Sequence, residues 1–454
     1  MNKVLLINSP NRQSEPPRHY PYGIGIISSI LRNNGYSVDY FDGNFQTTAE
    51  LYSVVAESNY SFIGLSGLVT TYEYQKNAIK TIKKANPAAI VGSGGGLASS
   101  ADIALLELVP ELDVLFIGEA EKSVLSFMKN LTGSLDSVKG IAYRTDQGIK
   151  RNPNEEFIKT LDDIPYPDID LLNLERYFEN KSFPLSPNVQ SASRRGNVLT
   201  SRGCPYHCDF CSNTLGRKVI RYRSTDNVIG EITELIGKYH IDFISFMDES
   251  FLTNKKLVYA LSEELKKLNR NIRWGIAARS TSVDAEILKE IKSAGCDYIY
   301  YGFDSGSENT LLRMNKKMTL DDNFNAFKLS VEAGIYPVPN IIIGYDNETM
   351  MNIEDNYRFF QRLIQYGKTL QKSNEKEFFE RGFNNFGAIY FATPYPGSEL
   401  YNRNKDSLPS IDQILSKISF KDAYELTVNV SNIPNDILMR EQKKMENFVR
   451  SFKL

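Results

Sequence analysis

The sequence contains few of the residues that hold small secreted proteins together. Among 454 residues there are four cysteines, three histidines and one tryptophan. Cys204, Cys208 and Cys211 lie within one short stretch, whereas Cys296 stands alone. Disulfide frameworks occur in short chains whose cysteines are spread along the sequence. Three clustered cysteines and one distant one in a long chain do not fit such a framework.

The chain also lacks an excess of charge and any long apolar run. Lys plus Arg number 53 and Asp plus Glu 55, a net charge of −2, which disfavours a basic face for duplex nucleic acid. No apolar run approaches the about 20 residues that span a bilayer. Residues 4–8 already resemble a strand, which leaves no room for a signal peptide. We therefore expect a cytoplasmic protein that binds neither nucleic acid nor membranes.

Length and composition indicate more than one folded unit. The prior is about 150 residues per domain, and the hydrophobic content of 41% and charged content of 24% are those of ordinary globular proteins. The sequence pattern divides the chain into four parts. We expect a first domain at 1–137, a connector at 138–195, a second domain at 196–395 and a carboxy-terminal lid or extension at 396–454.

In the first domain, short apolar strands alternate with helical stretches. The expected strands are 4–8, 37–41, 62–66, 89–92 and 114–117. Five such units predict an α/β fold with a doubly wound parallel sheet, whose ligands bind beyond the carboxyl ends of the strands. Those ends carry Ser66-Gly67, the glycine run 92–96 and Gly118-Glu119. Glycine lets a flat ligand approach the backbone closely, although each of these glycines is also an ordinary turn residue.

The connector contains a predicted hairpin around Asp146-Gln-Gly148 and a proline-rich stretch that cannot lie inside a helix. After it, the strand and helix alternation resumes with longer helices. The expected strands are 197–200, 243–247, 273–277, 298–303, 338–343 and 387–391. Six strand-helix units predict a partial (β/α)6 barrel, with its chemistry at the carboxyl ends of the strands. A small, mainly helical segment follows.

The cysteines occur in Cys204-Pro-Tyr-His-Cys208-Asp-Phe-Cys211, directly after the first strand of the barrel. Three thiolates at these spacings can hold three irons of a [4Fe-4S] cluster and leave the fourth iron open to another ligand. Structural zinc is the alternative, because His207 would complete a tetrahedral set. Zinc sites of this kind usually show two separated ligand pairs, so the cluster is favoured.

This motif, with the aromatic Phe210 and its place after the first strand, resembles that of the radical S-adenosylmethionine (SAM) superfamily. The resemblance implies that the open iron binds SAM and that an electron, from a flavodoxin- or ferredoxin-type donor, cleaves it to a 5′-deoxyadenosyl radical. That radical would take hydrogen from an unactivated carbon of a small molecule. Phe210 would belong to the SAM site. Asp248 and Glu249 would receive the methionine amino group, and Arg279 would face the carboxylate. Asp304 lies where relatives commonly carry Glu to contact the ribose, and Gly344 belongs to the segment that would flank the adenine.

The order of the domains resembles the cobalamin-binding members of the same superfamily. That resemblance implies cobalamin at the first sheet, in contact with Ser66, Gly94, Gly95, Gly96, Gly118 and Glu119. The Asp-x-His-x-x-Gly sequence that supplies a cobalt-ligating histidine in other cobalamin proteins is absent. We therefore expect cobalt without a histidine ligand.

The function that the resemblance favours is methyl transfer to an unactivated carbon of a small molecule or natural-product intermediate. The alternative within the same fold is a rearrangement, ring contraction or oxidative cyclisation without methyl transfer. Methylthiolation would need a second cysteine-bound cluster, which Cys296 alone cannot hold. From another class, a non-catalytic iron-sulfur or zinc protein remains open. We expect Cys296 and the aromatic side chains of Tyr298, Tyr300 and Tyr301 to lie in the core rather than in a substrate site.

Overall fold

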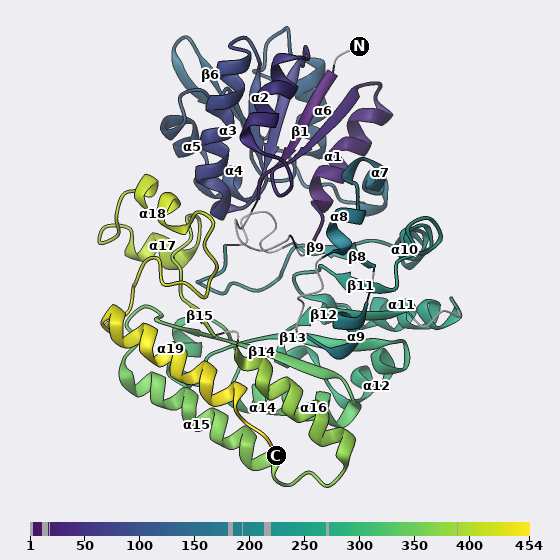
Figure 1. The fold of residues 1–454 in the computed structure, drawn as a ribbon, viewed down its shortest axis with the longest axis vertical. Coiled ribbons are helices and arrows are strands. Elements are labelled where there is room, and N and C mark those ends of the chain that lie inside the picture. Colours follow the sequence, from purple (N-terminus) through teal and green to yellow (C-terminus); the bar gives the residue numbers. More distant parts are fainter. Residues whose placement is uncertain are drawn as a thin grey trace. The chain divides into compact units, whose positions relative to one another are not determined.

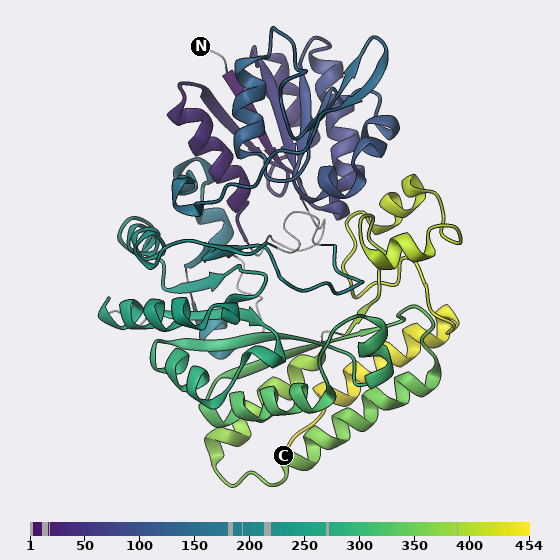
Figure 2. The same ribbon diagram turned by 180° about the vertical axis from the view of Figure 1, so that it is seen from behind.

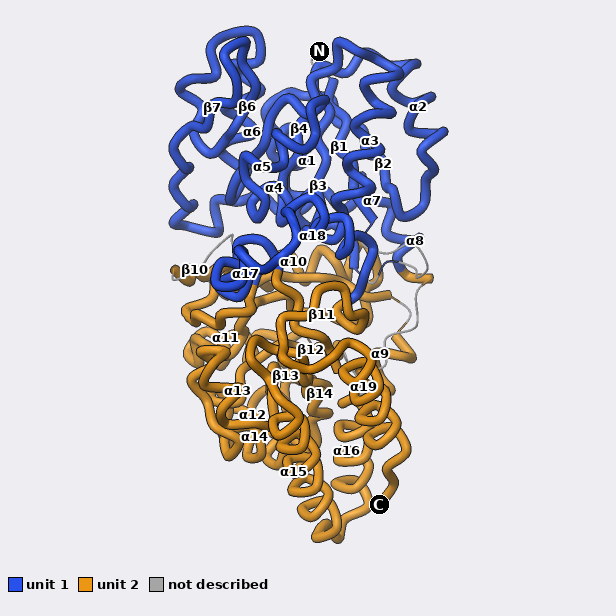
Figure 3. The backbone as a smooth tube through the Cα atoms, turned by 90° about the vertical axis from the view of Figure 1, so that its left-hand side faces the viewer, with its two compact units in different colours: residues 1–177, 212–216, 395–422 blue, residues 178–211, 217–394, 423–454 orange. Residues whose placement is uncertain are grey.

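The computed structural model describes residues 3–10, 17, 19–179, 185–192, 194–212, 219–268, 272–387 and 389–454. The chain forms two compact units (Figure 3). The first is built mainly from residues 1–177 and 395–422, and the second mainly from 178–211, 217–394 and 423–454. Within the described residues, no helix combines the length and apolar character needed to cross a membrane.

The first unit contains a seven-stranded sheet in the order β2-β1-β3-β4-β5-β6-β7. Strands β1 to β5 are parallel, and β6 and β7 extend the sheet as an antiparallel hairpin. The strands are β1 (Lys3–Asn8), β2 (Ser37–Asp42), β3 (Phe62–Ser66), β4 (Val91–Gly94), β5 (Val114–Phe116), β6 (Ile141–Thr145) and β7 (Gly148–Arg151). The predicted doubly wound parallel sheet is confirmed.

Helices cover both faces of this sheet (Figures 1 and 2). The helices that belong wholly or mainly to this unit are α1 (Tyr22–Asn33), α2 (Thr48–Ala56), α3 (Tyr72–Ala85), α4 (Gly95–Ala101), α5 (Ile103–Leu108), α6 (Glu121–Lys129), α7 (Ile169–Leu172), α8 (Glu175–Phe178), α17 (Glu399–Asn404) and α18 (Ile411–Ile418). Helix α2 starts with a capping box, in which the Thr47 side chain and the Glu50 side chain each bind the other's backbone N–H. The glycine run 92–96 ends β4 and leads directly into α4, which begins at Gly95.

Much of the segment expected as a connector packs onto the first unit. The predicted hairpin is present as β6 and β7, and it continues the sheet beside β5. Further along, the Asp168 carboxylate accepts a hydrogen bond from Ser28 at 2.7 Å and pairs with Arg32 at 3.0 Å, both on α1. Apolar side chains of this segment cover α1 next to Ile26. The hairpin has strand partners and the segment has apolar cover, so both belong to the folded unit.

The second unit contains six parallel strands in the order β15-β14-β13-β12-β11-β8, each beside its neighbour in the chain. They are β8 (Arg195–Val198), β11 (Phe243–Phe246), β12 (Arg273–Ala278), β13 (Cys296–Asp304), β14 (Tyr336–Ile343) and β15 (Ile389–Phe391). A short antiparallel pair, β9 (Ser201–Arg202) and β10 (Arg221–Tyr222), follows β8. The sheet confirms the predicted partial barrel.

Helices lie along the outer side of the barrel strands (Figures 1 and 2). The helices that belong to this unit are α9 (Pro187–Ser191), α10 (Thr225–Tyr239), α11 (Lys255–Lys267), α12 (Ala285–Ser293), α13 (Glu308–Arg313), α14 (Leu320–Ala333), α15 (Met350–Gly367), α16 (Ser373–Asn384) and α19 (Asn435–Arg450). Val258, Leu261 and Leu265 form a buried stripe on α11. Cys296, Tyr298 and Tyr301 are buried as expected, whereas Tyr300 is half-buried and its hydroxyl lies 2.8 Å from that of Tyr390.

The residues after 395 do not form one separate extension. Helix α18 packs on the first unit, where Leu415 and Ile418 join the core beside α3. Helix α19 belongs instead to the second unit, and Gln442 on it donates hydrogen bonds to the backbone of Ile389 and Tyr424. The apolar stripes of these two helices are therefore used in different cores.

Candidate functional site

The three clustered cysteines lie on the loop that follows β9. Cys204, Cys208 and Cys211 are outside disulfides and partly exposed, whereas Cys296 is buried at the start of β13. Burial raises the pKa of the Cys204 thiol, neighbouring Glu249 and Cys208 add to the rise, and Arg279 opposes it. The loop therefore offers three accessible thiols beside both an acidic and a basic side chain.

Asp248 fixes the backbone that leads into this loop. Its buried carboxylate accepts hydrogen bonds from the Thr200 backbone N–H at 3.0 Å, from the Thr200 hydroxyl at 2.7 Å and from the Ser201 hydroxyl. Burial raises the pKa of Asp248, and these hydrogen bonds oppose the rise. The carboxylate is thus used within the protein, while the next acidic residue, Glu249, is exposed. We expected both Asp248 and Glu249 in the SAM site, and only Glu249 is exposed to solvent.

Arg279 lies directly against the cysteine loop. Its Nη1 donates to Cys208 Sγ at 3.4 Å, and its guanidinium sits 3.8 Å from the centre of the Tyr206 ring. Its Nη2 donates to the backbone carbonyl of Lys316. Arg279 therefore ties Cys208 and Tyr206 of the cysteine loop to the backbone at Lys316.

The turn at residues 314–316, between α13 and α14, holds the same loop from the other side. The backbone N–H of Asp209 donates to the Met314 carbonyl at 3.0 Å, and the Asn315 side chain donates to the His207 carbonyl at 2.8 Å. Together with the bond from Arg279 to Lys316, these contacts fix the loop between Cys204 and Cys211. The position of the thiols therefore depends on a turn far away in the sequence.

Lys316 was not found by sequence reasoning, and it is the one buried lysine of this turn. Its ammonium group forms an ion pair with Asp304 and lies 5.6 Å from the centre of the Phe210 ring. Lys316 is 6% exposed and Asp304 is 5% exposed. The structure thus brings together Phe210, Arg279 and Asp304, as expected, and adds a second cation to them.

Gly344 ends β14 in a backbone conformation that favours glycine. Its φ is +76°, and a Cβ added to it would lie 2.6 Å from Leu438 on α19. Its N–H and that of Tyr345 donate to Glu348, which is fully buried and was not singled out from the sequence. Burial raises the pKa of Glu348 to about 7. Gly344 therefore shapes the turn after β14.

The geometry offers no ready site for the zinc alternative. Among the described residues, no three His, Cys, Asp or Glu side chains are gathered closely enough to hold a single metal ion. The thiols of a four-iron cluster bind different irons and can stand further apart than the ligands of one zinc ion. The donor set of three thiols and no fourth cysteine fits a cluster with one open iron.

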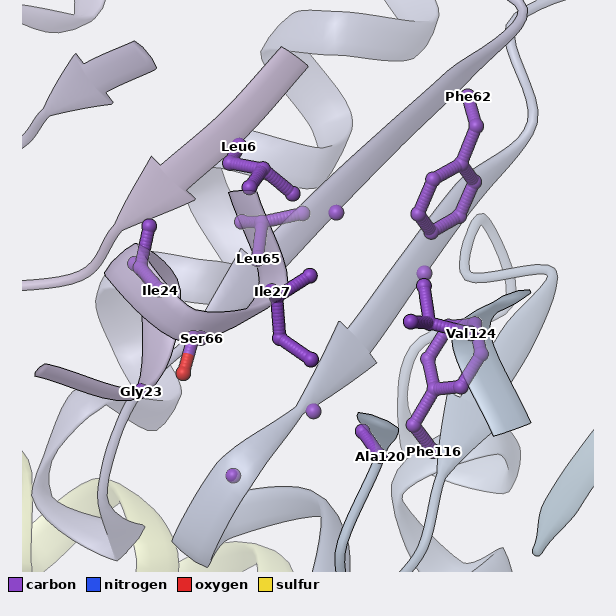
Figure 4. Close-up of a pocket in the computed structure, with 14 residues that line it drawn as sticks. Leu6, Gly23, Ile24, Ile27, Phe62, Leu65, Ser66, Phe116, Ala120 and Val124 are labelled. Atoms are coloured by element: carbon purple, nitrogen blue, oxygen red, sulfur yellow. The ribbon is translucent and has the colours of Figure 1, made fainter. Parts of the chain in front are cut away.

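The first unit contains a pocket between the sheet and helices α1 and α6 (Figure 4). Its empty volume is about 470 Å³, which includes space open to solvent, and its lining is mainly apolar. The lining residues are Leu6, Gly23, Ile24, Ile27, Phe62, Gly64, Leu65, Ser66, Gly92, Gly94, Gly95, Phe116, Ala120 and Val124. Figure 4 shows Ile27 of α1 on one side and Phe62 and Phe116 of the sheet on the other.

Glycines keep this pocket open. A Cβ at Gly64 would lie 3.0 Å from the Phe62 ring, and one at Gly92 would lie 2.8 Å from it. Gly95 has a φ of +80°, and its added Cβ would lie 3.0 Å from the Gly67 carbonyl. A slot with bare backbone on one wall suits a flat ligand group.

Half of the residues expected to contact cobalamin line this pocket. Ser66, Gly94 and Gly95 do so. Gly96 does not, and neither do Gly118 and Glu119, which follow β5. The apolar residues of α1 and α6 were missed, because an amphipathic helix gives no sign of which part of its buried face meets a cavity.

Two families match the chain. Residues 198–360 match the radical SAM superfamily, and residues 13–127 match the B12 binding domain. The chain is a radical SAM enzyme with a B12-binding domain. This confirms the predicted family and cofactors, a [4Fe-4S] cluster, SAM and cobalamin.

Several relatives of this radical SAM enzyme are similar along most of its length. An uncharacterized methyltransferase of Pyrococcus horikoshii is 26% identical over 387 residues, which cover 84% of this chain and 77% of that protein. The cytidylyl-2-hydroxyethylphosphonate methyltransferase of Streptomyces wedmorensis is 27% identical over 449 residues, covering 88% and 80%. The anaerobic magnesium-protoporphyrin IX monomethyl ester cyclase of Cereibacter sphaeroides is 27% identical over 350 residues, covering 74% and 56%.

A solved structure shares the fold of the radical SAM enzyme described here. It is that of the cobalamin-dependent S-adenosylmethionine radical enzyme OxsB with aqua-cobalamin bound. The TM-score is 0.74 at 22% identity, and the match covers 90% of this chain and 61% of that chain. The order of a doubly wound domain and a partial barrel is thus confirmed.

Proposed function

We propose that this enzyme transfers a methyl group from SAM, by way of cobalamin, to an unactivated carbon of a small molecule. The observation that carries the proposal is the pairing of an open, glycine-lined pocket in the B12-binding domain with a single set of three accessible thiols in the barrel. When bound, the cluster with SAM supplies a 5′-deoxyadenosyl radical, and cobalamin carries the methyl group. Two of the relatives described above are methyltransferases.

On this proposal, Cys204, Cys208 and Cys211 hold the cluster. Arg279 donates a hydrogen bond to Cys208 Sγ, and the turn at 314–316 holds the loop in place. Glu249 is exposed beside Cys204 and suits the ammonium group of SAM, which needs an acceptor of opposite charge. Asp248 acts as a positioning residue, through Thr200 and Ser201.

We assign the carboxylate of SAM to the two cations beside Phe210. Arg279 and Lys316 are both buried behind the cysteine loop, and a buried cation stabilises a bound carboxylate more than an exposed one does. Asp304 remains the proposed contact of the ribose, and Gly344 keeps its proposed place near the adenine. In the first unit, the apolar pocket is too small for a corrin ring, so we assign it to the benzimidazole of the cobalamin tail.

The same proposal includes a protein partner and a compartment. The cluster needs an external electron, for which we propose a flavodoxin- or ferredoxin-type donor. Cysteines outside disulfides and a reducible cluster with an open iron are suited to a reducing compartment, which supports a cytoplasmic location. A cyclisation or rearrangement without methyl transfer is the second candidate, supported by the similarity to the magnesium-protoporphyrin cyclase.

The first experiment follows the methyl group. The full chain is reconstituted anaerobically with cluster and cobalamin, reduced with titanium(III) citrate and given SAM that carries a deuterated methyl group. We expect the label on cobalamin and an equal amount of S-adenosylhomocysteine. Replacing Cys204, Cys208 and Cys211 together by Ala should abolish both the cluster absorbance and the reductive cleavage of SAM, whereas Cys296→Ala, a change at the buried cysteine, should preserve them. Reductive cleavage without any methylated cobalamin would contradict methyl transfer and favour the second candidate.

A further inference from the structure

Tyr300 lies on the inner face of the barrel sheet, although the sequence led us to expect it in the core. Its neighbour Tyr301 points outward, because the Tyr301 hydroxyl lies 2.9 Å from that of Ser330 on α14. Successive side chains of a strand point to opposite faces of the sheet, so Tyr300 points inward. Tyr301 is buried and Tyr300 is half-buried, so part of the Tyr300 side chain is accessible on the inner face.

The inner face has an apolar floor beneath Tyr300. Side chains of β11, β13 and β14 meet those around α9 in one buried cluster, and Tyr300 packs against it. The rings of Phe243 and Tyr298 are stacked in this cluster with their centres 6.0 Å apart. The buried members are Leu185, Val189, Ala192, Phe243, Tyr298, Tyr336 and Val338.

Above this floor the inner face is partly accessible. Ala277 of β12 pairs with Tyr300, Ile342 of β14 pairs with Tyr390 of β15, and all four residues are half-buried. Gly302 follows Tyr300 by two residues, about 7 Å along the strand. A Cβ added to Gly302 would lie 3.1 Å from the ammonium group of Lys316. The surface around Tyr300 therefore lies between the apolar floor and the buried cation that we assign to SAM.

A pair of tyrosine hydroxyls is the polar feature of this surface. The hydroxyls of Tyr300 and Tyr390 lie 2.8 Å apart, and the Tyr424 ring stacks on that of Tyr390 with centres 5.0 Å apart. Burial raises the pKa of Tyr300 to about 12 and raises that of Tyr390 further, so both hydroxyls keep their protons at neutral pH. Two hydroxyls carry two protons and the bond between them uses one. The other proton is left for an acceptor from outside the pair.

We propose that Tyr300 and Tyr390 bind an uncharged carbonyl oxygen of the substrate, and that the body of the substrate around this oxygen is apolar. The inference rests on the proposed function, which places SAM beside Lys316 in the same unit. Ala277, Ile342 and the two tyrosine rings offer apolar contacts to that body. A carboxylate or phosphate would lose its water for a neutral donor, which is unfavourable because an ion removed from water needs a partner of opposite charge.

The test measures how small probes bind to the full chain loaded with cluster, cobalamin and SAM, without reductant. Acetophenone carries a carbonyl, ethylbenzene has a CH2 group in its place, and benzoate carries a carboxylate. Titrations followed by saturation-transfer NMR give each affinity. In the wild type we expect acetophenone to bind at least about threefold more tightly than benzoate. The double variant Tyr300→Phe with Tyr390→Phe keeps both rings, and it should weaken acetophenone at least about threefold, the usual effect of one lost hydrogen bond, and leave ethylbenzene within about twofold.

Tyr301→Phe is the matched control, because it removes a hydroxyl from the next residue on the outer face. Acetophenone should bind to it within about twofold of wild type. Equal weakening of acetophenone and ethylbenzene in the double variant would mean that the hydroxyls only support the structure, and would overturn the inference.

Unchanged acetophenone binding in the double variant, or undetectable binding in the wild type, would overturn the inference as well. If the double variant does not fold, the wild type decides, since benzoate bound as tightly as acetophenone would reject an uncharged site. None of these measurements needs turnover. The proposed function is therefore tested separately, by the labelled methyl group.

Discussion

At the scale of single residues, Lys316 and Asp304 place two opposite charges in the interior of the second unit. They pair with each other and are 6% and 5% exposed. A charge removed from water needs a partner of opposite sign, so each of the two is stable there only because of the other. The sequence gives no sign of this arrangement, because a lysine in Met314-Asn-Lys-Lys is typical of a solvated turn.

We predict that Lys316→Met destabilises the second unit by about 3–5 kcal/mol, the usual effect of leaving one buried charge without its partner. The double variant Lys316→Met with Asp304→Asn should recover a large part of this loss, since no charge then remains buried. Asparagine also tolerates the positive φ of +61° at position 304. Urea unfolding followed by the fluorescence of Trp274, the one tryptophan, reports on this unit. A double variant as unstable as the single one would show that the buried charge is not the cause.

At the scale of elements, the turn after β14 depends on a buried acid. Glu348 accepts hydrogen bonds from the N–H groups of Gly344 and Tyr345, and burial raises its pKa from 4.5 to about 7. Between these two pH values the folded protein keeps a proton that the unfolded chain releases. The free energy of unfolding contributed by Glu348 is therefore complete below pH 4.5 and decreases as the pH rises to about 7.

Glu348→Gln should remove this pH dependence, because the amide does not titrate. We expect the stability of the variant relative to wild type to improve between pH 5 and pH 8, by up to about 3 kcal/mol. Urea unfolding of both proteins at pH 5 and pH 8, followed by Trp274 fluorescence, measures this difference in the free energy of unfolding. Glu354→Gln on the exposed side of α15 is the control and should show no such change. An equal difference at both pH values would mean that Glu348 is ionised throughout.

The elements that the sequence predicts best are those with a local signal. The strands and their order follow from short apolar runs between helices, and the cysteine loop follows from its spacing. Three features have no such signal: the pairing of β6 and β7 with the sheet, the use of α18 and α19 in different cores, and the pocket between α1 and α6. Each of them depends on which distant segment covers an apolar face, and amphipathic periodicity does not identify the partner.

At the scale of the whole molecule, each unit is made from segments that are distant in the chain. Residues 395–422 complete the first unit, and 423–454 return to the second. The pocket is lined only by residues of the first unit, whereas the three cysteines belong to the second. The proposed cofactor sites therefore use different side chains, and a change inside one of them can leave the other intact.

This separation predicts that the two reactions of SAM can be uncoupled. Ala120 lines the pocket from the start of α6, and its backbone φ of −93° accepts a larger side chain (Figure 4). We expect Ala120→Phe to fill the pocket and reduce bound cobalamin at least tenfold, while cluster content and the reductive cleavage of SAM to 5′-deoxyadenosine stay within twofold of wild type. Formation of S-adenosylhomocysteine should fall in proportion to the cobalamin that is lost. Tyr52→Phe, on the exposed side of α2 in the same unit, is the control and should preserve both products. Unchanged cobalamin binding in Ala120→Phe would show that the tail of the cofactor does not enter this pocket, and loss of the cluster together with cobalamin would show that the two sites are not independent.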